Sequence, residues 1–479
     1  MATDSPSARV RARLAHPVID ADGHTVEFWP ALAAYVREEG LRPDPDRPLS
    51  SLGVLPAWGR LTPSERAERR CVRTPWWAFP AKNTLDLATA TLPALLHARL
   101  DELGIDFAVA YPSLGLVFLH LPDDEARRAT CRALNRYHAD VFRDLRDRLE
   151  PVAVIPMQTP AEAIEELEHA VRGLGFKAVL LGGYAVRTVP SVARAAPTVA
   201  DHATWLDAFG LDSPFDYDPV WAKCAELGVS VAAHSVGMGW GSRRSISSYV
   251  YNHIGNFAAA GEMLARSLFL GGVTRRFPSL RFAFLEGGVA WGRTLYGDLI
   301  SHWEKRNRDA VQLYNPVHVD RALFGRLLEQ YGGELLKRAA ASGGSPGVAA
   351  EAPVEDAGAT DDFAACEIGS VEDLRNLFVP RFFFGCEADD PLTALAFDRR
   401  LCPGGVRLNA LFGSDIGHWD VPDAREVLAE AFALVDRGLL SREDFRDFSF
   451  ANAARFYLET NPDFFRGTRV EDATRALFQ

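Results

Sequence analysis

The 479-residue sequence predicts an α/β fold, a (β/α)8 TIM barrel, built as one domain over residues 1–479. Three observations predict this fold. Eight short apolar segments recur along the chain, and segments with helical spacing of apolar residues lie between several of them. In addition, five of the eight apolar segments end in Asp, Glu or His, and catalytic groups in such barrels gather at strand ends.

The eight apolar segments are the expected strands. Each is almost continuously apolar, which is typical of parallel strands that are buried on both faces. They cover residues 17–24, 106–113, 150–156, 176–183, 229–235, 281–288, 381–387 and 409–415.

Four intervening segments have apolar residues at helical spacing, and we expect them to be helices that cover the barrel. In one of them, Thr159 is followed three residues later by Glu162, which predicts a capping box. The four segments are 123–149, 159–175, 213–228 and 423–439.

Two stretches interrupt this alternation. Residues 25–105 are too long for one strand-to-strand crossover, and we interpret them as an inserted cap over the barrel mouth. Residues 338–362 are rich in Ala, Gly, Pro and acidic residues, a composition that predicts a flexible surface loop.

Composition excludes several classes of protein. A formal net charge of −12 with mixed signs along the chain argues against nucleic-acid binding. The six cysteines form no metal or disulfide pattern, and neither a leader peptide nor a membrane-spanning segment is evident. We therefore expect a soluble, cytoplasmic protein with no membrane partner, and a homo-oligomer remains open.

The strand ends carry the candidate site. Asp22 and His24 share one side of the first strand because side chains alternate with a period of two, so Asp20 is expected to face outward. Polar residues that end buried strands are costly unless they are paired or bind a metal. The remaining candidates at strand ends are His234, Glu286, Glu387, Asp415 and the nearby His418.

The ligand types indicate which metal the site would take. Two imidazoles with three or four carboxylates suit Fe(II), Mn(II) or Zn, and the absence of cysteine argues against a thiolate zinc site. This number of carboxylates can neutralise two divalent ions, so a dinuclear site is one alternative.

The pattern resembles the amidohydrolase superfamily, in its branch of amidohydrolase-related proteins and nonoxidative decarboxylases, from residue 17 to about 465. His24 takes the second position of that family's His-x-His motif, and His234 and Asp415 match the ligands after strands five and eight. Asp22 and Glu286 stand where the family usually has histidines. The resemblance implies a metal site, and the two carboxylates favour iron over zinc.

A smaller group within that resemblance is the barrel-type nonheme diiron monooxygenases that act on CoA-linked acids, among them diterpenoid acids. The segments 247–257, 284–307 and 412–423 carry this likeness. It implies hydroxylation of an unactivated carbon by O2, with an electron donor and two Fe ions per chain, Zn or Mn being the alternative metals. The ligands would be Asp22, His24, His234, His253, Glu286 and Asp415, and the catalytic residues would be Asp415, His418 and Glu286.

An acyl-CoA substrate would also need contacts away from the metal. Arg243 and Arg244 would hold its phosphates, because guanidinium groups match phosphate geometry. Residues 76–80, Trp240 and Trp291 would line an apolar chamber.

Three alternatives remain open from the sequence. A metal-dependent hydrolase would cleave a thioester, amide or lactone with Asp415 as general base. A nonoxidative decarboxylase would release CO2 from an aromatic acid, with Asp415 or His418 moving the proton. A barrel that only binds a ligand is the third alternative. The roles of His253, Glu387, His138 and His302 are undecided, and the last two are expected to be packing residues.

Overall fold

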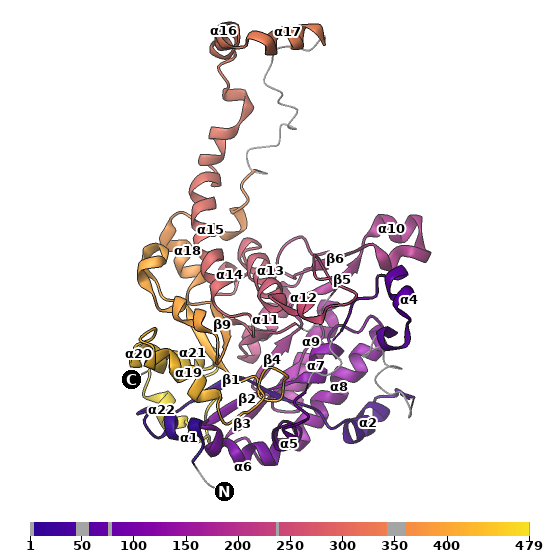
Figure 1. Ribbon diagram of the computed structural model, residues 1–479, viewed down its shortest axis with the longest axis vertical. Helices are drawn as coiled ribbons and strands as arrows, with labels where there is room; N and C mark the ends of the chain where they lie inside the picture. Colours follow the sequence, from indigo (N-terminus) through magenta and orange to yellow (C-terminus); the bar gives the residue numbers. More distant parts are fainter. Residues whose placement is uncertain (1–3, 45–56, 75–78, 236–238, 343–359, 479) are drawn as a thin grey trace.

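The computed structural model describes residues 4–44, 57–74, 79–235, 239–342 and 360–478. Eight strands pair in parallel and in chain order, forming a nearly closed barrel (Figure 1). All eight predicted strands are confirmed, although several are shorter than expected. They are β1 (Ile19–Thr25), β2 (Phe107–Pro112), β3 (Leu149–Val154), β4 (Ala178–Leu181), β7 (Val231–Ala233), β8 (Phe282–Phe284), β9 (Phe382–Glu387) and β10 (Asn409–Gly413).

The first and last strands are joined by their ends. The backbone N–H of Asp415 donates to the carbonyl of Asp22 at 3.0 Å. A Cβ at Gly413 would lie 2.9 Å from the Cβ of Asp22, so glycine allows this close approach. The Asp20 carboxylate accepts from the hydroxyl of Ser414 at 2.5 Å and from its amide at 3.0 Å. The expectation that Asp20 faces outward is therefore wrong: it is buried and links the two strands.

Alternate residues of the strands belong to different apolar clusters. Phe382 and Phe384 pack in one cluster, whereas Phe383 between them packs in another. Val179 and Leu180 divide in the same way. This division is what a period-two strand produces when both faces of the sheet are buried.

The main helices lie around the strands, and the four predicted helices are present. The capping box of Thr159 and Glu162 is confirmed. The helix expected from 213 starts only at Asp218, because the Ser213 and Asp216 side chains accept backbone N–H groups in turns before it. The main helices are α8 (Asp124–Val141), α9 (Pro160–Glu168) with η2 (His169–Gly173), α11 (Asp218–Leu227), α13 (Asn256–Leu270), α15 (Ala290–Arg306), α18 (Val371–Phe378), α19 (Val427–Asp436) and α21 (Asn452–Leu458).

Short helices complete the connections between these elements. They are α1 (Pro6–Arg11), α7 (Ser113–Phe118), α10 (Pro190–Ala195), η3 (Pro197–His202), α12 (Tyr249–His253), α14 (Val273–Arg276), η6 (Ala364–Cys366), η7 (Pro391–Ala396), η8 (Arg399–Leu401), η9 (Pro403–Gly405), α20 (Arg442–Arg446), η10 (Asp447–Ala451) and α22 (Glu471–Arg475).

The segment 25–105 is largely helical where the structure describes it. Its indole and backbone groups contact the loop after β7: Trp58 Nε1 donates to the Ile246 carbonyl at 3.1 Å, and the Arg73 amide donates to the Ser245 carbonyl at 2.9 Å. These contacts are with a loop on the carboxyl side of the strands, and the role of a cap stays a prediction. The helices are α2 (Trp29–Glu38), η1 (Ala57–Arg60), α4 (Pro63–Glu68), α5 (Thr84–Thr91) and α6 (Pro93–Leu103).

Two features were not predicted. A two-stranded antiparallel hairpin, β5 (Ala185–Thr188) and β6 (Thr204–Asp207), follows the fourth barrel strand. Beyond α15 the chain continues away from the barrel through four further helices (Figure 1). These are η4 (Ala310–Tyr314), η5 (Pro316–His318), α16 (Arg321–Tyr331) and α17 (Gly333–Ala341).

Two expectations from the sequence concern residues 338–362 and membrane-spanning helices. Of the loop predicted over 338–362, residues 338–341 belong to α17, and 343–359 lie outside the described residues. Among the helices that the structure describes, none combines the length and apolar character that a bilayer crossing requires.

Candidate metal centre

Residues from four strand ends meet on the carboxyl side of the barrel. Asp22 and His24 lie in β1, His234 directly follows β7, Glu286 follows β8 and Asp415 follows β10. In three groups, which share members, each residue offers a ligand atom within 4.8 Å of the others. The groups are Asp22, His24 and His234; His24, Glu286, Asp415 and His418; and Glu286, Glu387 and Asp420.

The distances between ligand atoms are short. His24 Nε2 lies 3.6 Å from Asp22 Oδ1 and 3.4 Å from Asp415 Oδ1. His234 Nε2 lies 2.8 Å from Glu286 Oε2, and the rings of His24 and His234 have centroids 5.2 Å apart. The structure thus brings together five of the six predicted ligands.

Several of these atoms lie within ion-pair distance of one another, as His234 Nε2 and Glu286 Oε2 do, but they make no hydrogen bond with one another. His24 Nε2, His234 Nε2 and Glu286 Oε2 are buried and have no hydrogen-bond partner among the described residues. The same holds for Asp22 Oδ1, whereas Asp415 Oδ1 lies 2.6 Å from His418 Nδ1. Buried polar atoms are normally hydrogen-bonded, so a converging set of orphaned nitrogen and oxygen atoms fits a divalent cation.

The electrostatics favour the same conclusion. Burial raises the pKa of Asp415 well above its usual range, and the charges of Glu286 and Asp420 raise it further. Burial raises the pKa of Glu387 to about 9, with Glu286 and Asp420 as the next causes. Burial lowers the pKa of His24 and of His234, which favours the neutral imidazole that binds metals. A bound cation would let the carboxylates ionise together.

Two of the carboxylates sit on strained backbone. Glu286 has a φ of 58° and Asp415 a φ of 48°, a left-handed conformation that side chains other than glycine rarely adopt. Each residue ends a barrel strand and turns its carboxylate into the cluster. Such outliers persist where the surrounding structure holds them, and they concentrate at functional sites.

A chain of polar groups connects Asp415 to a second strand end. His418 Nδ1 lies 2.6 Å from Asp415 Oδ1, and His418 Nε2 lies 3.0 Å from the hydroxyl of Ser113, next to β2. Burial lowers the pKa of His418 to about 4, so its ring is neutral at pH 7. A neutral imidazole between a carboxyl group and a hydroxyl can accept a proton at one nitrogen and donate one at the other.

Aromatic rings extend from the metal cluster toward the surface. The ring of His234 packs edge-on against Phe257, with centroids 5.0 Å apart, and Phe257 packs against His253 at 5.3 Å. His253 in turn lies 5.6 Å from Trp419, which is half exposed. The structure does not bring His253, a predicted ligand, into any of the three ligand groups.

The structure describes the residues predicted to contact CoA and part of the predicted apolar chamber. Arg243 donates to the Gly255 carbonyl at 2.7 Å and so holds its own loop, whereas Arg244 is exposed. Trp291 packs between Phe284 and Phe384, at 5.4 and 5.2 Å, in the layer outside the strands. Of residues 76–80, those numbered 76–78 lie outside the described residues.

The structure places the residues whose roles the sequence leaves open. His302 is exposed on α15, and His138 is buried with its Nε2 3.5 Å from Glu27 Oε1. Both lie outside the three ligand groups; His138 is buried, as expected of a packing residue, whereas His302 is exposed and is not one. Glu387 and Asp420 join Glu286 in the third group. The sequence did not predict Asp420, because it lies in a turn seven residues beyond the end of β10, where side chains do not alternate in direction as they do along a strand.

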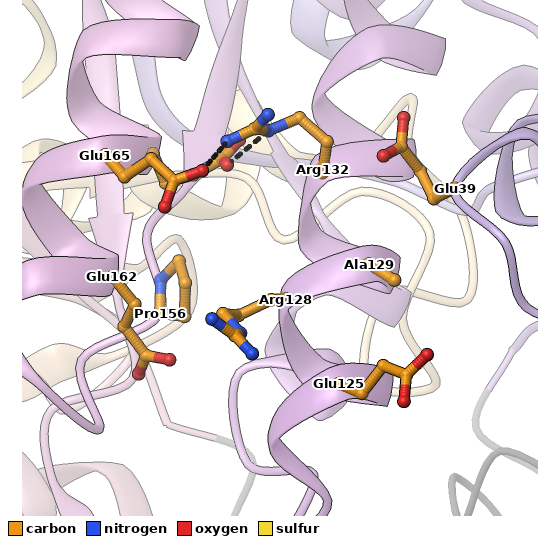
Figure 2. Close-up of a pocket in the computed structure, with 9 residues that line it drawn as sticks. Glu39, Glu125, Arg128, Ala129, Arg132, Pro156, Glu162 and Glu165 are labelled. Atoms are coloured by element: carbon orange, nitrogen blue, oxygen red, sulfur yellow. Dashed lines mark hydrogen bonds and ion pairs between the residues drawn. The ribbon is translucent and has the colours of Figure 1, made fainter.

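A pocket of about 240 Å³ lies elsewhere, between α8 and α9 (Figure 2). Part of its charged lining is paired within the pocket: Arg132 contacts Glu165 at 3.3 Å and Glu166 at 2.6 Å. None of the strand-end residues lines it, so it is separate from the metal cluster.

The comparisons with known proteins agree with the barrel. Residues 121–336 match the family model described as amidohydrolase. The 2-amino-3-carboxymuconate-6-semialdehyde decarboxylase of Dictyostelium discoideum is 23% identical over 185 residues, which cover 39% of this chain and 44% of that relative's length.

One solved structure extends the likeness of fold to almost the whole chain. An amidohydrolase from Mycobacterium avium subsp. paratuberculosis is 20% identical with a TM-score of 0.52, covering 93% of this chain and 100% of that one. The 5-carboxyvanillate decarboxylase from Sphingomonas paucimobilis is 15% identical with a TM-score of 0.48, over 92% and 98% of the two chains.

The prediction of a diiron monooxygenase is wrong on these findings, because the curated relative is a decarboxylase and the similarity agrees with the decarboxylase alternative. Iron, O2, an electron donor and a CoA-linked substrate rested on the monooxygenase likeness, and nothing in the comparisons supports them. Residues 121–336, less than half of the chain, are similar to the amidohydrolase family, and the likeness to the Mycobacterium structure shows the barrel fold along almost the whole chain.

Proposed function

We propose that this protein is a metal-dependent nonoxidative decarboxylase of an aromatic or conjugated carboxylic acid. The observation that carries the proposal is the Asp415–His418–Ser113 chain beside His24 and His234. Loss of CO2 without an oxidant requires a proton at the carbon that CO2 leaves. The series of polar groups from Ser113 through His418 to Asp415 provides a route for that proton. The similarity to a decarboxylase supports the same reaction.

The metal would be held by Asp22, His24, His234 and Asp415, with Glu286 beside them. Imidazole and carboxylate ligands suit Mn or Zn. Such an ion, when bound, supplies a Lewis acid that fixes the carboxylate and a neighbouring oxygen of the substrate. The number of ions is left to measurement, because Glu286 also belongs to the group with Glu387 and Asp420.

Asp415 and His418 would handle the proton. As the bond between the ring carbon and the carboxyl carbon breaks, its electron pair stays on the ring carbon and CO2 departs. A proton held between Asp415 and His418 then forms the new C–H bond, so the net change is the exchange of CO2 for H. His418 is 15% exposed, so solvent can restore the proton through it.

The surrounding rings support a planar substrate. Phe257, His253 and Trp419 follow one another from His234 outward, and Phe79 lies 6.4 Å from the ring of His418. Flat conjugated acids stack on or against such rings more favourably than bulky saturated ones.

The test is CO2 release by protein loaded with Mn or Zn, under argon, from a panel of hydroxybenzoic acids and conjugated dicarboxylic acids. We expect metal-dependent CO2 release from at least one of them. In D2O, the product should carry one deuterium at the carbon that lost CO2. Turnover of esters, amides or lactones in place of the acids would contradict the proposal and favour the hydrolase alternative, with Asp415 as general base.

A further inference from the structure

A buried carboxylate near the end of the first strand supports the helix that carries Ser113. Glu27 lies two residues beyond β1, and its side chain is fully buried. Its Oε2 accepts a hydrogen bond from the backbone N–H of Leu114, the second residue of α7, at 2.7 Å. Among the described residues, the three ligand groups do not include Glu27. Metal binding therefore does not account for this buried carboxylate.

Helix α7 needs an acceptor from elsewhere in the chain. The first N–H groups of a helix have no partner within the helix, and the residue before α7 is Pro112, whose side chain cannot accept a hydrogen bond. At six residues, α7 is also too short to be stable by itself. Glu27 therefore takes the place of an N-cap residue, and it joins the first turn of α7 to the segment that follows β1.

A histidine on α8 restricts the Glu27 carboxylate from its other side. The second carboxylate oxygen, Oε1, lies 3.5 Å from His138 Nε2, within ion-pair distance. The ring of His138 is itself buried and contacts the rings of Tyr137 and Phe142, with centroids 5.5 and 5.6 Å away. Because packing fixes this ring, the carboxylate has little room to turn away from Leu114.

The first residue of α7 belongs to the proposed proton route. Ser113 directly precedes Leu114, and its hydroxyl lies 3.0 Å from His418 Nε2. Hydrogen bonds weaken steeply as their geometry departs from the ideal, and a misplacement of about 1 Å can slow an enzyme substantially. A small movement of the first turn of α7 would therefore separate Ser113 from His418.

We propose that Glu27 is a positioning residue for the reaction: by holding the Leu114 amide, it keeps the Ser113 hydroxyl in contact with His418. Glu27 transfers no proton itself and acts through Ser113. This role rests on the proposed function, because Ser113 affects turnover only through His418. It explains why a carboxylate is buried behind α7, where it binds no metal and contacts a helix that has no cap of its own.

A double-mutant cycle on CO2 release by the metal-loaded protein tests this role. Glu27→Ala should lower kcat roughly two- to tenfold, the factor that one hydrogen bond is worth, and Ser113→Ala should lower it by a similar factor. In the double variant the two losses should not multiply, because both act through one contact. Glu27→Gln retains an oxygen that can accept from Leu114, and it should restore most of the lost rate. The metal content should be the same in all of these variants.

Glu150 provides a matched control for the loss of a buried carboxylate. It is 2% exposed, and its carboxylate accepts the backbone N–H of Lys177 at 3.2 Å. It lies at the start of β3, whereas the metal cluster lies at the carboxyl ends of the strands. Glu150→Ala should lower the free energy of unfolding about as much as Glu27→Ala does, but kcat should stay at the wild-type value.

Chemical modification of His418 gives a measurement that needs no turnover. Diethyl pyrocarbonate acylates unprotonated imidazole nitrogens, and mass spectrometry identifies the modified residue. Loss of the Ser113 contact frees Nε2, so Glu27→Ala and Ser113→Ala should both increase the rate at which His418 is modified. Wild-type protein and Glu150→Ala should share the slower rate.

Three results would overturn the role of Glu27. They are an unchanged rate of His418 modification in Glu27→Ala, losses of kcat that multiply in the double variant, and a Glu27→Gln variant as slow as Glu27→Ala. A wild-type protein that releases no CO2 would instead overturn the proposed function, and the modification rates alone would then decide whether Glu27 positions Ser113.

Discussion

Asp20 of the first strand and Ser414, next to the last strand, are joined by two hydrogen bonds to one carboxylate, at 2.5 and 3.0 Å. Asp20 and Ser414 stand shortly before Asp22 and Asp415 in the chain, and these two aspartates are candidate metal ligands that are themselves joined by a backbone hydrogen bond. The hydrogen bonds that join the first strand to the last therefore also help to fix the distance between Asp22 and Asp415.

Loss of this contact should weaken both the fold and the site. Ser414→Ala leaves a buried carboxylate without its hydroxyl donor, and we expect a loss of about 1–3 kcal/mol in the free energy of unfolding. Metal affinity should fall as well, because Asp22 and Asp415 lose their fixed spacing. Urea denaturation and metal titration measure the two effects. Ser342→Ala, at an exposed serine, should change neither.

The histidines of the cluster should be required for metal binding. His24→Ala and His234→Ala each remove a buried ligand nitrogen, and elemental analysis should show loss of the bound metal from both variants. His302→Ala is the matched control, because His302 is an exposed histidine on α15 and should leave the metal content intact. Full metal content in His234→Ala would remove this residue from the site.

The proton route should be separable from metal binding at His418. His418→Gln should lower kcat roughly 100- to 10,000-fold, the usual contribution of a positioned acid or base, while the metal content stays constant. Ser113→Ala should have a smaller effect and should shift the pH profile of kcat, because the hydroxyl acts only through His418. Unchanged turnover in His418→Gln would rule out this route.

Stability of the metal-free protein should depend on pH through Glu387. Burial raises the pKa of this carboxyl from 4.5 to about 9, so between these pH values the unfolded chain releases a proton that the folded chain retains. The free energy of unfolding should therefore decline from pH 5 to pH 9 and then level off. Bound metal lowers the pKa in the folded state and should flatten this decline.

Thermal unfolding of the metal-free protein across this pH range measures the decline. Glu387→Gln should reduce it, whereas Glu334→Gln, at an exposed glutamate, should retain it. An identical decline in Glu387→Gln would show that other carboxyls cause it. A parallel metal titration of Glu387→Gln shows whether this residue also holds a cation.

The barrel and most residues of its candidate metal site could be predicted because both follow from local pattern. Continuous apolar segments mark strands that are buried on both faces, and the carboxyl ends of parallel strands must meet. Asp22, His24, His234, Glu286 and Asp415 could be selected on that basis alone. Asp420 could not, since its place in the third ligand group depends on how a turn folds back.

Other errors arose where tertiary contacts decide. The alternation of side chains along the first strand predicts that Asp20 points outward. The last strand packs against the first at that point, however, and buries the Asp20 side chain. Helices α16 and α17 have ordinary amphipathic sequences, and only the fold shows that their large apolar side chains are exposed. The choice of an oxygenase relied on ligand charge, and ligand charge does not define the reaction that a metal site carries out.

The left-handed backbone of Glu286 and Asp415 has an evolutionary consequence. A glycine at either position would relieve about 1 kcal/mol of conformational strain, at the expense of a ligand. Selection for stability alone would therefore tend to erase the metal centre one strand end at a time. In proteins that descend from this barrel, glycine at these two positions would be an early sign that metal binding and catalytic activity have been lost.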